Sequence, residues 1–204
     1  MFVGRTRELA VLEELRESGR PELFVLYGRR RVGKTELLQQ LCEGGRAVYF
    51  LAAQVRERDN LRAFREALKD GLGGDPLVDG IEFPDWSTAL GFTAERAGDE
   101  RLIVVLDEFP YLCDSSKGLP SQVQKFWDTR GKNSQLMLIL FDCMVSPSVQ
   151  FVPRKASFPP DGCFRAMKRM ARNVWPIYRF YTVRNEISEH RAGSPDGGPF
   201  SLFT

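Results

Sequence analysis

The chain has 204 residues, of which 43% are hydrophobic and 27% charged, so it can bury a core and wholesale disorder is excluded. The formal net charge of +2 gives no electrostatic argument for a protein of nucleic acids or membrane surfaces. The single histidine excludes sites built from several imidazoles. The four cysteines fall at no zinc-like spacing, so we expect reduced thiols. No apolar run approaches the roughly 18 residues of a membrane span. Charge is reached by Arg5, which argues against a signal peptide, and we therefore expect a cytoplasmic protein.

Composition divides the chain after Phe141. Leucine occurs 21 times in residues 1–141 and once in residues 142–204, whereas seven of the 12 prolines lie in the later part. The earlier part carries 20 Lys and Arg against 22 Asp and Glu, and the later part carries 9 against 5. We therefore predict a leucine-rich core over 1–141 and a basic tail over 142–204.

In chain order, helices and strands are expected to alternate. The predicted elements are a helix over 5–18, a strand over 23–27, a helix over 34–42, a strand over 47–52, a helix capped by Asp59 or Asn60 and closed by Gly71, a loop over 71–84, a helix over 86–97, a strand over 102–106, a helix over 120–129 and a strand over 136–141. In the tail, only a weak helix over 164–172 and an alternating stretch over 177–183 stand out. This order is typical of an α/β fold with a parallel sheet covered on both faces.

Residues 28–35 read G-R-R-R-V-G-K-T and match the phosphate-loop pattern G-x-x-x-x-G-K-[ST] at every fixed position. The predicted strand before Gly28 and the predicted helix from Lys34 supply the context, because backbone N–H groups and a helix N-terminus then face the phosphates. Lys34 is expected to neutralise the β- and γ-phosphates, and Thr35 to bind Mg²⁺ through its hydroxyl. The three arginines of the loop either contact a phosphate or a neighbouring subunit, or are solvated charges. The residues expected around the phosphates are Gly28, Arg29, Arg30, Arg31, Val32, Gly33, Lys34, Thr35 and Glu36.

Residues 102–108, L-I-V-V-L-D-E, supply a second half for this site. The apolar run predicts a buried strand whose carboxyl end delivers two acids, at the edge where open α/β sheets bind ligands. Asp107 is expected to hold Mg²⁺ through its water shell. Glu108 is expected to act as the catalytic carboxylate that orients and polarises an attacking water. No Asn-Lys-x-Asp segment is present, so a GTPase is disfavoured.

Four ordered segments resemble the archaeal-type P-loop ATPases, a family related to the AAA+ and STAND ATPases. They are F-V-G-R at 2–5 followed by E-L at 8–9, the phosphate loop, Y-F-L-A-A-Q at 49–54, and L-D-E-F-P-Y-L at 106–112. The resemblance covers about residues 2–140. It implies a three-layer P-loop NTPase fold with strand order 5-1-4-3-2, in which the strand over 136–141 lies between the two motif strands. It also implies ATP and Mg²⁺ as cofactors.

The same resemblance implies contacts on the adenine side of the nucleotide. Phe2, Val3 and Arg5 would lie there, although Phe2 and Val3 could equally be ordinary packing residues. Gln54 resembles a polar residue that senses the state of the nucleotide. Arg130 could supply an arginine to a neighbouring subunit, or could simply end a helix in solvent. Self-association is thus left open.

The tail departs from the family pattern. The fourth strand should end in a small polar residue near the γ-phosphate, but it runs into Asp142, whose negative charge is unfavourable there. No helical lid is recognisable. One hypothesis is an aberrant, poorly ordered tail produced by a frameshift, a truncation or a mis-joined gene. The alternative is a divergent tail whose residues 177–183 supply the fifth strand.

The sequence thus predicts an ATP-binding protein that hydrolyses ATP with Mg²⁺. One alternative is a truncated nucleotide-binding remnant without turnover. Another is a nucleic-acid-binding module that uses the basic tail residues Arg165, Lys168, Arg169 and Arg172, although a non-selected arginine-rich sequence explains them as well.

Overall fold

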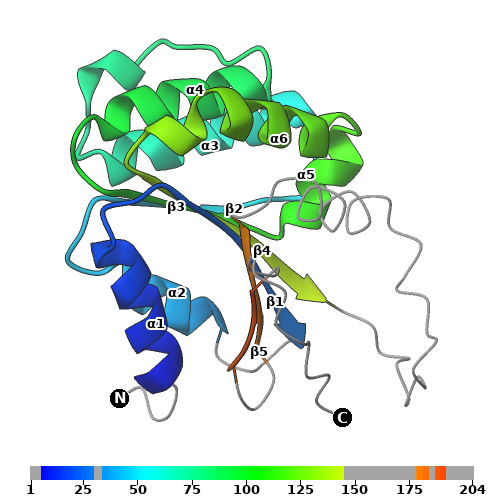
Figure 1. The fold of residues 1–204 in the computed structure, drawn as a ribbon. Helices are drawn as coiled ribbons and strands as arrows, with labels where there is room; N and C mark the ends of the chain where they lie inside the picture. The colour runs from blue at the N-terminus through cyan, green and yellow to red at the C-terminus, as the bar shows by residue number, and fades with distance from the viewer. Residues whose placement is uncertain (1–5, 30–33, 145–177, 184–186, 192–204) are drawn as a thin grey trace.

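The computed structural model describes residues 6–29, 34–144, 178–183 and 187–191, and its centre is a mostly parallel sheet (Figure 1). The strands are β1 (Glu22–Arg29), β2 (Ala47–Leu51), β3 (Leu102–Asp107), β4 (Leu136–Met144), β5 (Tyr178–Val183) and β6 (Ile187–Arg191). Their order is β2-β3-β4-β1-β5-β6, and only the β5–β6 pair among them is antiparallel. The first five strands therefore follow the predicted order 5-1-4-3-2.

Helices cover both faces of the sheet, which makes the predicted three-layer α/β fold (Figure 1). One face carries α1 (Thr6–Glu17) and α2 (Lys34–Cys42). The other carries α3 (Glu57–Gly71), α4 (Trp86–Ala97), α5 (Phe109–Ser115) and α6 (Leu119–Thr129). Two short 3₁₀ helices lie at Pro76–Val78 and Gly131–Asn133. None of the helices in the described part of the chain is long and apolar enough to cross a bilayer.

The apolar runs of the central strands follow from burial on two sides. All six residues of β3 are buried, and they alternate between the two cores. Leu102, Val104 and Leu106 pack with the α3–α6 layer, whereas Ile103 and Val105 pack with the α1–α2 layer. A central strand of a parallel sheet has this environment, so its sequence shows a continuous apolar run rather than an alternating pattern.

An aromatic cluster forms the core beneath α3 and α4. The Trp86 ring lies 5.3 Å from Phe64 and 6.0 Å from Phe50, measured between centroids. The predicted loop over 71–84 closes this core with the buried Val78 and Phe83. Its start needs a glycine, because a Cβ on Gly71 would stand 2.3 Å from the carbonyl oxygen of Ala47. α3 can therefore approach β2 closely only with glycine at this position.

Two arginines bind helix ends at the amino edge of the sheet, where the parallel strands begin. Arg101, just before β3, donates to the carbonyl oxygens of Leu15 at 2.5 Å, Arg16 at 3.0 Å and Arg20 at 2.5 Å. Arg46, just before β2, donates to the Arg96 carbonyl at 2.7 Å and to the Ala97 carbonyl at 3.0 Å. Each guanidinium thus satisfies carbonyls that the C-terminus of α1 or α4 leaves without a helical partner.

Several boundaries differ from the predictions. β1 continues two residues past Tyr27 because Gly28 is paired on both sides, with Cys143 of β4 and Val183 of β5. The same pairing carries β4 beyond Phe141 to Met144. α3 begins at Glu57, earlier than the expected Asp59 or Asn60 cap, and its N-cap Arg56 makes no side-chain cap hydrogen bond.

The short helix α5 and the strand β6 were not predicted. Among the cysteines, Cys42 is a free thiol and Cys113 is disulfide-bonded, so the expectation of reduced thiols is wrong for Cys113.

The predicted tail contributes two of the described strands. β5 pairs in parallel with β1, at the place that the divergent-tail alternative gives to residues 177–183. The helix expected over 164–172 lies outside the described residues. The division of the chain at 141 and the aberrant origin of the tail stay predictions.

Candidate nucleotide-binding site

The predicted site residues lie along the carboxyl edge of the sheet. β1 ends there at Arg29, α2 begins at Lys34 after the intervening loop, and β3 ends there at Asp107. Only β4 lies between β1 and β3. With neighbouring strands about 4.8 Å apart, the ends of β1 and β3 are therefore roughly 10 Å apart. The strand order thus brings the two predicted motifs to one edge.

The frame of the predicted phosphate loop is described at both of its ends. Gly28 lies in β1 between two paired strands, and Lys34 and Thr35 form the first positions of α2. The side chains of Thr35 and Glu36 are exposed at this helix start. Twelve of the predicted site positions fall at the loop and the N-terminus, and seven of these lie outside the described residues. The positions outside are Phe2, Val3, Arg5, Arg30, Arg31, Val32 and Gly33.

Asp107 is a buried carboxylate whose two oxygens are held by different groups. Its side chain is only 4% exposed. The backbone N–H of Glu108 donates to Oδ1 at 2.7 Å, and the hydroxyl of Tyr49 donates to Oδ2. The Asp107 carbonyl accepts from the N–H of Ala52 at 3.0 Å, which ties the end of β3 to the end of β2. The carboxylate is therefore fixed in position at the sheet edge.

Tyr49 is a site residue that the sequence analysis missed. It lies on β2, opposite Val105 of β3, and its half-buried ring packs with the α1–α2 layer. Burial raises the pKa of the Tyr49 hydroxyl, and the bonded Asp107 carboxylate raises it further. Thr35, at the start of α2, acts on the pKa of Tyr49 in the opposite direction. Tyr49 could have been noticed in the sequence because it is the one residue of the strand A-V-Y-F-L whose side chain has a polar tip. A buried tyrosine hydroxyl needs a hydrogen-bond partner.

Glu108 forms the turn between β3 and α5. Its φ of 53° and ψ of 42° place it in the left-handed region, and it is the non-glycine residue with positive φ in the described part of the chain. Its carbonyl accepts from the N–H of Tyr111 at 2.9 Å, which begins α5. A side chain in this region costs about 1 kcal/mol or more, and such strain gathers at functional sites. The half-buried Glu108 lies directly beside the fixed carboxylate of Asp107.

Asn60 holds the segment that follows β2. Its side chain is buried, with Nδ2 donating to the Ala53 carbonyl at 3.0 Å and Oδ1 accepting from the Ala53 N–H at 3.1 Å. Gln54, the next residue, is exposed. Its predicted sensing role stays a prediction.

Arg130 lies at the opposite edge of the sheet. It follows α6 shortly before the amino end of β4, and its guanidinium lies 3.4 Å from the Glu95 carboxylate. It also covers Gly91, where a Cβ would stand 2.6 Å from Nη1. Arg130 therefore packs on α4 and is remote from the Asp107 edge of its own chain.

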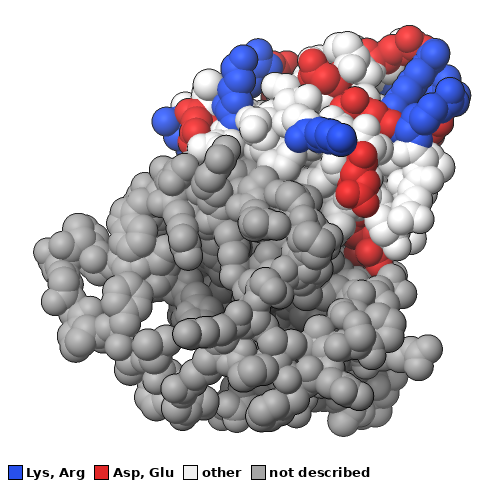
Figure 2. Space-filling model, turned by 90° about the vertical axis from the view of Figure 1, so that its right-hand side faces the viewer, with Lys and Arg blue, Asp and Glu red and all other residues white. Residues whose placement is uncertain are grey.

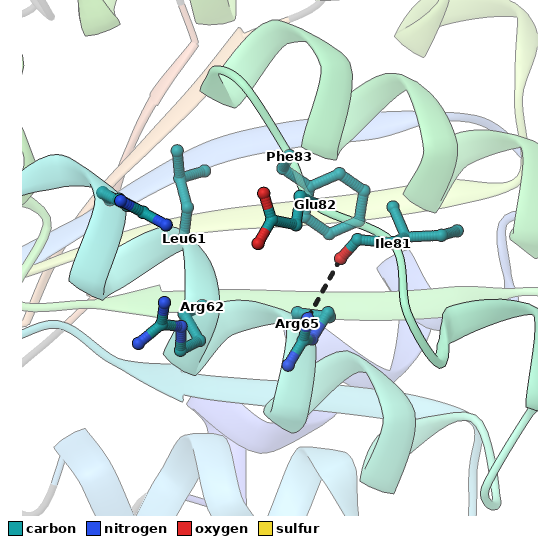
Figure 3. Close-up of a pocket in the computed structure, with 7 residues that line it drawn as sticks. Leu61, Arg62, Arg65, Ile81, Glu82 and Phe83 are labelled. Atoms are coloured by element: carbon teal, nitrogen blue, oxygen red, sulfur yellow. Dashed lines mark hydrogen bonds between the residues drawn. The ribbon is translucent and has the colours of Figure 1, made fainter.

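A pocket between α3 and the loop over 81–83 contains none of the predicted nucleotide residues (Figure 3). Apolar side chains of Leu61, Ile81 and Phe83 line it, with arginines and Glu82 around them. The Arg65 guanidinium donates to the Ile81 carbonyl at 3.2 Å and so joins α3 to the loop.

The described face in Figure 2 gives no support to nucleic-acid binding. Basic and acidic side chains are interspersed on the face shown in Figure 2. The basic cluster proposed from the tail, at positions 165–172, lies outside the described residues.

The donor chemistry at the Asp107 edge fits a magnesium ion. The Asp107 carboxylate and the Thr35 hydroxyl are hard oxygen donors, and the Tyr49 hydroxyl holds the Asp107 carboxylate by a hydrogen bond. In the part of the chain that the structure describes, no group of three or more His, Cys, Asp or Glu side chains could enclose a metal. A cation that keeps water and phosphate oxygens as ligands, as Mg²⁺ does, suits so sparse a donor set.

Comparison with known proteins places the chain in a family. Residues 2–157 match the family described as an ATPase domain predominantly from Archaea, a range that runs past Phe141. An uncharacterised protein of Methanocaldococcus jannaschii is 32% identical over 146 residues, which are 72% of this chain and 30% of that protein. An uncharacterised ATP-binding protein of the same organism is 49% identical over 43 residues, 21% of this chain and 73% of that protein.

Two solved structures are similar to this chain at low identity. The Walker-type ATPase PABY2304 of Pyrococcus abyssi has a TM-score of 0.48 at 18% identity, covering 68% of this chain and 45% of that one. Cdc6p of Pyrobaculum aerophilum has a TM-score of 0.46 at 19% identity, covering 71% and 40%. The chain thus spans less than half the length of these solved chains and 30% of the first M. jannaschii relative.

Proposed function

Because the chain belongs to this ATP-binding family of ATPase domains, we propose that it binds ATP with Mg²⁺ and hydrolyses the γ-phosphate. The observation that supports this most is the strand order, which brings the predicted phosphate loop after β1 and the buried Asp107 carboxylate at the end of β3 to one edge of the sheet. The Tyr49 hydroxyl and the backbone N–H of Glu108 hold that carboxylate in position. The loop and the acid are the two groups that a phosphate-bound magnesium ion would need together.

Binding of the phosphates is assigned to the loop between β1 and α2. Gly28 and Gly33 let the backbone wrap a phosphate, and the N-terminus of α2 contributes partial positive charge. Lys34 neutralises the β- and γ-phosphates. Thr35 and Asp107 hold the cation, which when bound neutralises charge on the phosphate oxygens.

Proton transfer is assigned to Glu108. Its carboxylate accepts a proton from a water as the water oxygen bonds to the γ-phosphorus and the bond from that phosphorus to the ADP oxygen breaks. The strained turn at Glu108 supports this assignment, since it follows directly on the fixed Asp107 carboxylate. The arginines of the loop, Glu36 and the adenine-side residues Phe2, Val3 and Arg5 complete the proposed nucleotide contacts.

Nucleotide titration and phosphate release on three variants test this function. Lys34→Ala is expected to abolish nucleotide binding, because the β- and γ-phosphate charge is then left unneutralised. Glu108→Gln is expected to keep binding and to lower phosphate release by about 10²- to 10⁴-fold, the contribution of a positioned base. The exposed Lys117→Ala, on the loop before α6, is the matched control and should change neither.

The outcomes separate the alternatives. Phosphate release that survives Lys34→Ala would overturn the site assignment. Binding without any turnover in the parent chain would favour the nucleotide-binding remnant over the ATPase.

A further inference from the structure

The pocket between α3 and the loop over 81–83 has an apolar lining (Figure 3). Leu61 and Phe83 are buried there, and Ile81 is half-buried beside them. The empty space of about 330 Å³ includes volume open to solvent. This is at the low end of the roughly 300–1,000 Å³ that small-molecule pockets provide. The pocket therefore suits one apolar side chain better than a whole cofactor or metabolite.

The loop that forms one wall of the pocket is held in place. The Arg65 guanidinium donates to the Ile81 carbonyl at 3.2 Å, and the Lys69 ammonium lies 2.5 Å from the Asp79 carboxylate. The ring of Phe83 packs 5.7 Å from that of Phe92, measured between centroids. The pocket is thus formed in advance, so an occupant would not have to order the loop first.

Three arginines of α3 line the pocket, namely Arg58, Arg62 and Arg65. Their spacing of four and three residues places them on one face of the helix. Arg65 is already engaged, by the Glu66 carboxylate at 2.6 Å and by the loop. Arg58 and Arg62 are exposed, and neither forms an ion pair or a side-chain hydrogen bond within the described part of the chain. Two guanidinium groups one helical turn apart are therefore available to an anionic partner.

The other groups at the pocket distinguish a partner with a few carboxylates from a nucleic acid. Glu82 lines the same pocket, and Glu66 lies beside Arg65, so closely spaced phosphates would meet negative charge. Sites for single-stranded nucleic acids also offer aromatic rings on which bases stack. Phe83 is the aromatic residue of this pocket, and it is only 8% exposed. The charges and the apolar lining together favour an acidic peptide.

We infer that this pocket docks an acidic segment of a partner protein: one apolar side chain enters the apolar lining, and carboxylates on either side of it pair with Arg58 and Arg62. The inference goes beyond the proposed function and does not depend on it, because none of the residues that line the pocket belongs to the predicted nucleotide site. Exposed ion pairs contribute little one at a time, so recognition requires the apolar side chain as well as the charges.

The test applies the full chain to three arrays of short synthetic peptides. Peptides of the first array carry one apolar residue flanked by Asp and Glu. The second array replaces every acid by Lys, and the third replaces the apolar residue by Gly. Fluorescence anisotropy then gives the affinity of the selected peptides for the parent chain and its variants.

Arg62→Glu and Lys125→Glu are the matched variants. Both reverse one exposed positive charge in the middle of a helix, but Lys125 lies on α6 and does not line the pocket. The melting temperature of each variant shows that it is folded, and sedimentation gives its oligomeric state.

The parent chain is expected to select the acidic array over the other two. Arg62→Glu should weaken binding of the selected peptides about 10-fold and shift the preference toward the Lys array, because repulsion replaces attraction at the rim. Lys125→Glu should change neither the affinity nor the preference. A merely structural role of Arg62 would not produce this change of preference.

Four results would overturn the inference. The first is a parent chain that selects no acidic peptide, or binds the Lys or Gly array equally well. The second is an equal loss of affinity in Lys125→Glu. The third is a dimer of the parent chain that Arg62→Glu dissociates, since the occupant would then be a second copy. The fourth is a single-stranded oligonucleotide that the parent chain binds and Arg62→Glu does not, since the pocket would then serve a nucleic acid.

Discussion

The two edges of the sheet use polar side chains for different purposes. At the amino edge, Arg101 and Arg46 bind mainly backbone carbonyls, with the Ser18 hydroxyl and one exposed acid beside them, and so hold helix ends in place. At the carboxyl edge, polar side chains bind one another, with the Tyr49 hydroxyl donating to the Asp107 carboxylate. The amino edge therefore contributes to the stability of the fold. The carboxyl edge keeps backbone strain and a buried charge, which selection for stability alone would not favour.

Replacing Glu108 should give the largest effect and the sharpest contrast between the edges. Glu108→Gly removes both the carboxylate and the left-handed strain at φ 53°. We expect phosphate release to fall by about 10²- to 10⁴-fold. We also expect the free energy of unfolding to rise by up to about 1 kcal/mol, because glycine adopts this conformation without penalty. Phosphate release and urea unfolding measure the two effects.

The matched variant Glu108→Gln keeps the strained backbone. It should lose turnover equally and gain no stability. If Glu108→Gly is less stable than the parent chain, the carboxyl edge holds no usable strain and the contrast with the amino edge fails.

Arg101 tests the amino edge. Arg101→Met keeps the aliphatic stem and removes the bonds to the Leu15, Arg16 and Arg20 carbonyls. Burial lowers the pKa of the Arg101 guanidinium, and the charge of Glu22 acts in the opposite direction. We expect unfolding to become easier by about 1–3 kcal/mol, the cost of leaving such groups unsatisfied. Urea unfolding checks this value.

Nucleotide affinity is the control for that variant. It should stay at the parent value, since the lost contacts lie at the edge opposite to Asp107. A loss of nucleotide affinity without a loss of stability would contradict the division of labour between the edges.

The smallest expected effect is a loss of stability at alkaline pH that comes from Cys42, at the C-terminal end of α2. Burial raises the pKa of the Cys42 thiol from 9.0 to about 11. The thiol of the unfolded chain then loses its proton at a lower pH than the thiol of the folded chain. The contribution of the protonated thiol to the free energy of unfolding is therefore complete below pH 9 and is lost as the pH rises toward 11. Because the thiol is partly exposed, we expect a loss of about 1 kcal/mol or less.

Urea unfolding at pH 8 and pH 10.5 measures this loss. Cys42→Ala removes the titrating group and is the reference. A decline of equal size in both proteins would assign the effect to other groups, of which Tyr49, with its raised pKa, is the first to consider.

Much of the architecture could be predicted from local patterns. The buried runs of β3 and β4 and the apolar spacing of α4 depend on the residues of those segments themselves. The predicted phosphate loop was likewise visible as a contiguous motif. The helix α5 escaped because it has only seven residues and follows a left-handed glutamate that no local signal requires.

Long-range pairing explains the other differences. β1 ends at Arg29 rather than at the predicted residue 27, because β4 and β5 pair with it. The contact of Tyr49 with Asp107 depends on the register of β2 with β3. Neither the end of β1 nor the contact of Tyr49 can be predicted from the residues that neighbour Gly28 or Tyr49 in the sequence. The expected nucleotide contacts were predicted from the motif alone, whereas the hydrogen bond from Tyr49 to Asp107 was not predicted.

The position of β1 has a further consequence for the chain. β1 lies between β4 and β5, so the strand that leads into the phosphate loop has its backbone paired on both sides. A chain that ended at Met144 would leave β1 as an outer strand with a row of unpaired N–H and C=O groups, which template the joining of one molecule to another. Residues 178–183 thus pair the edge of β1 that would otherwise be open.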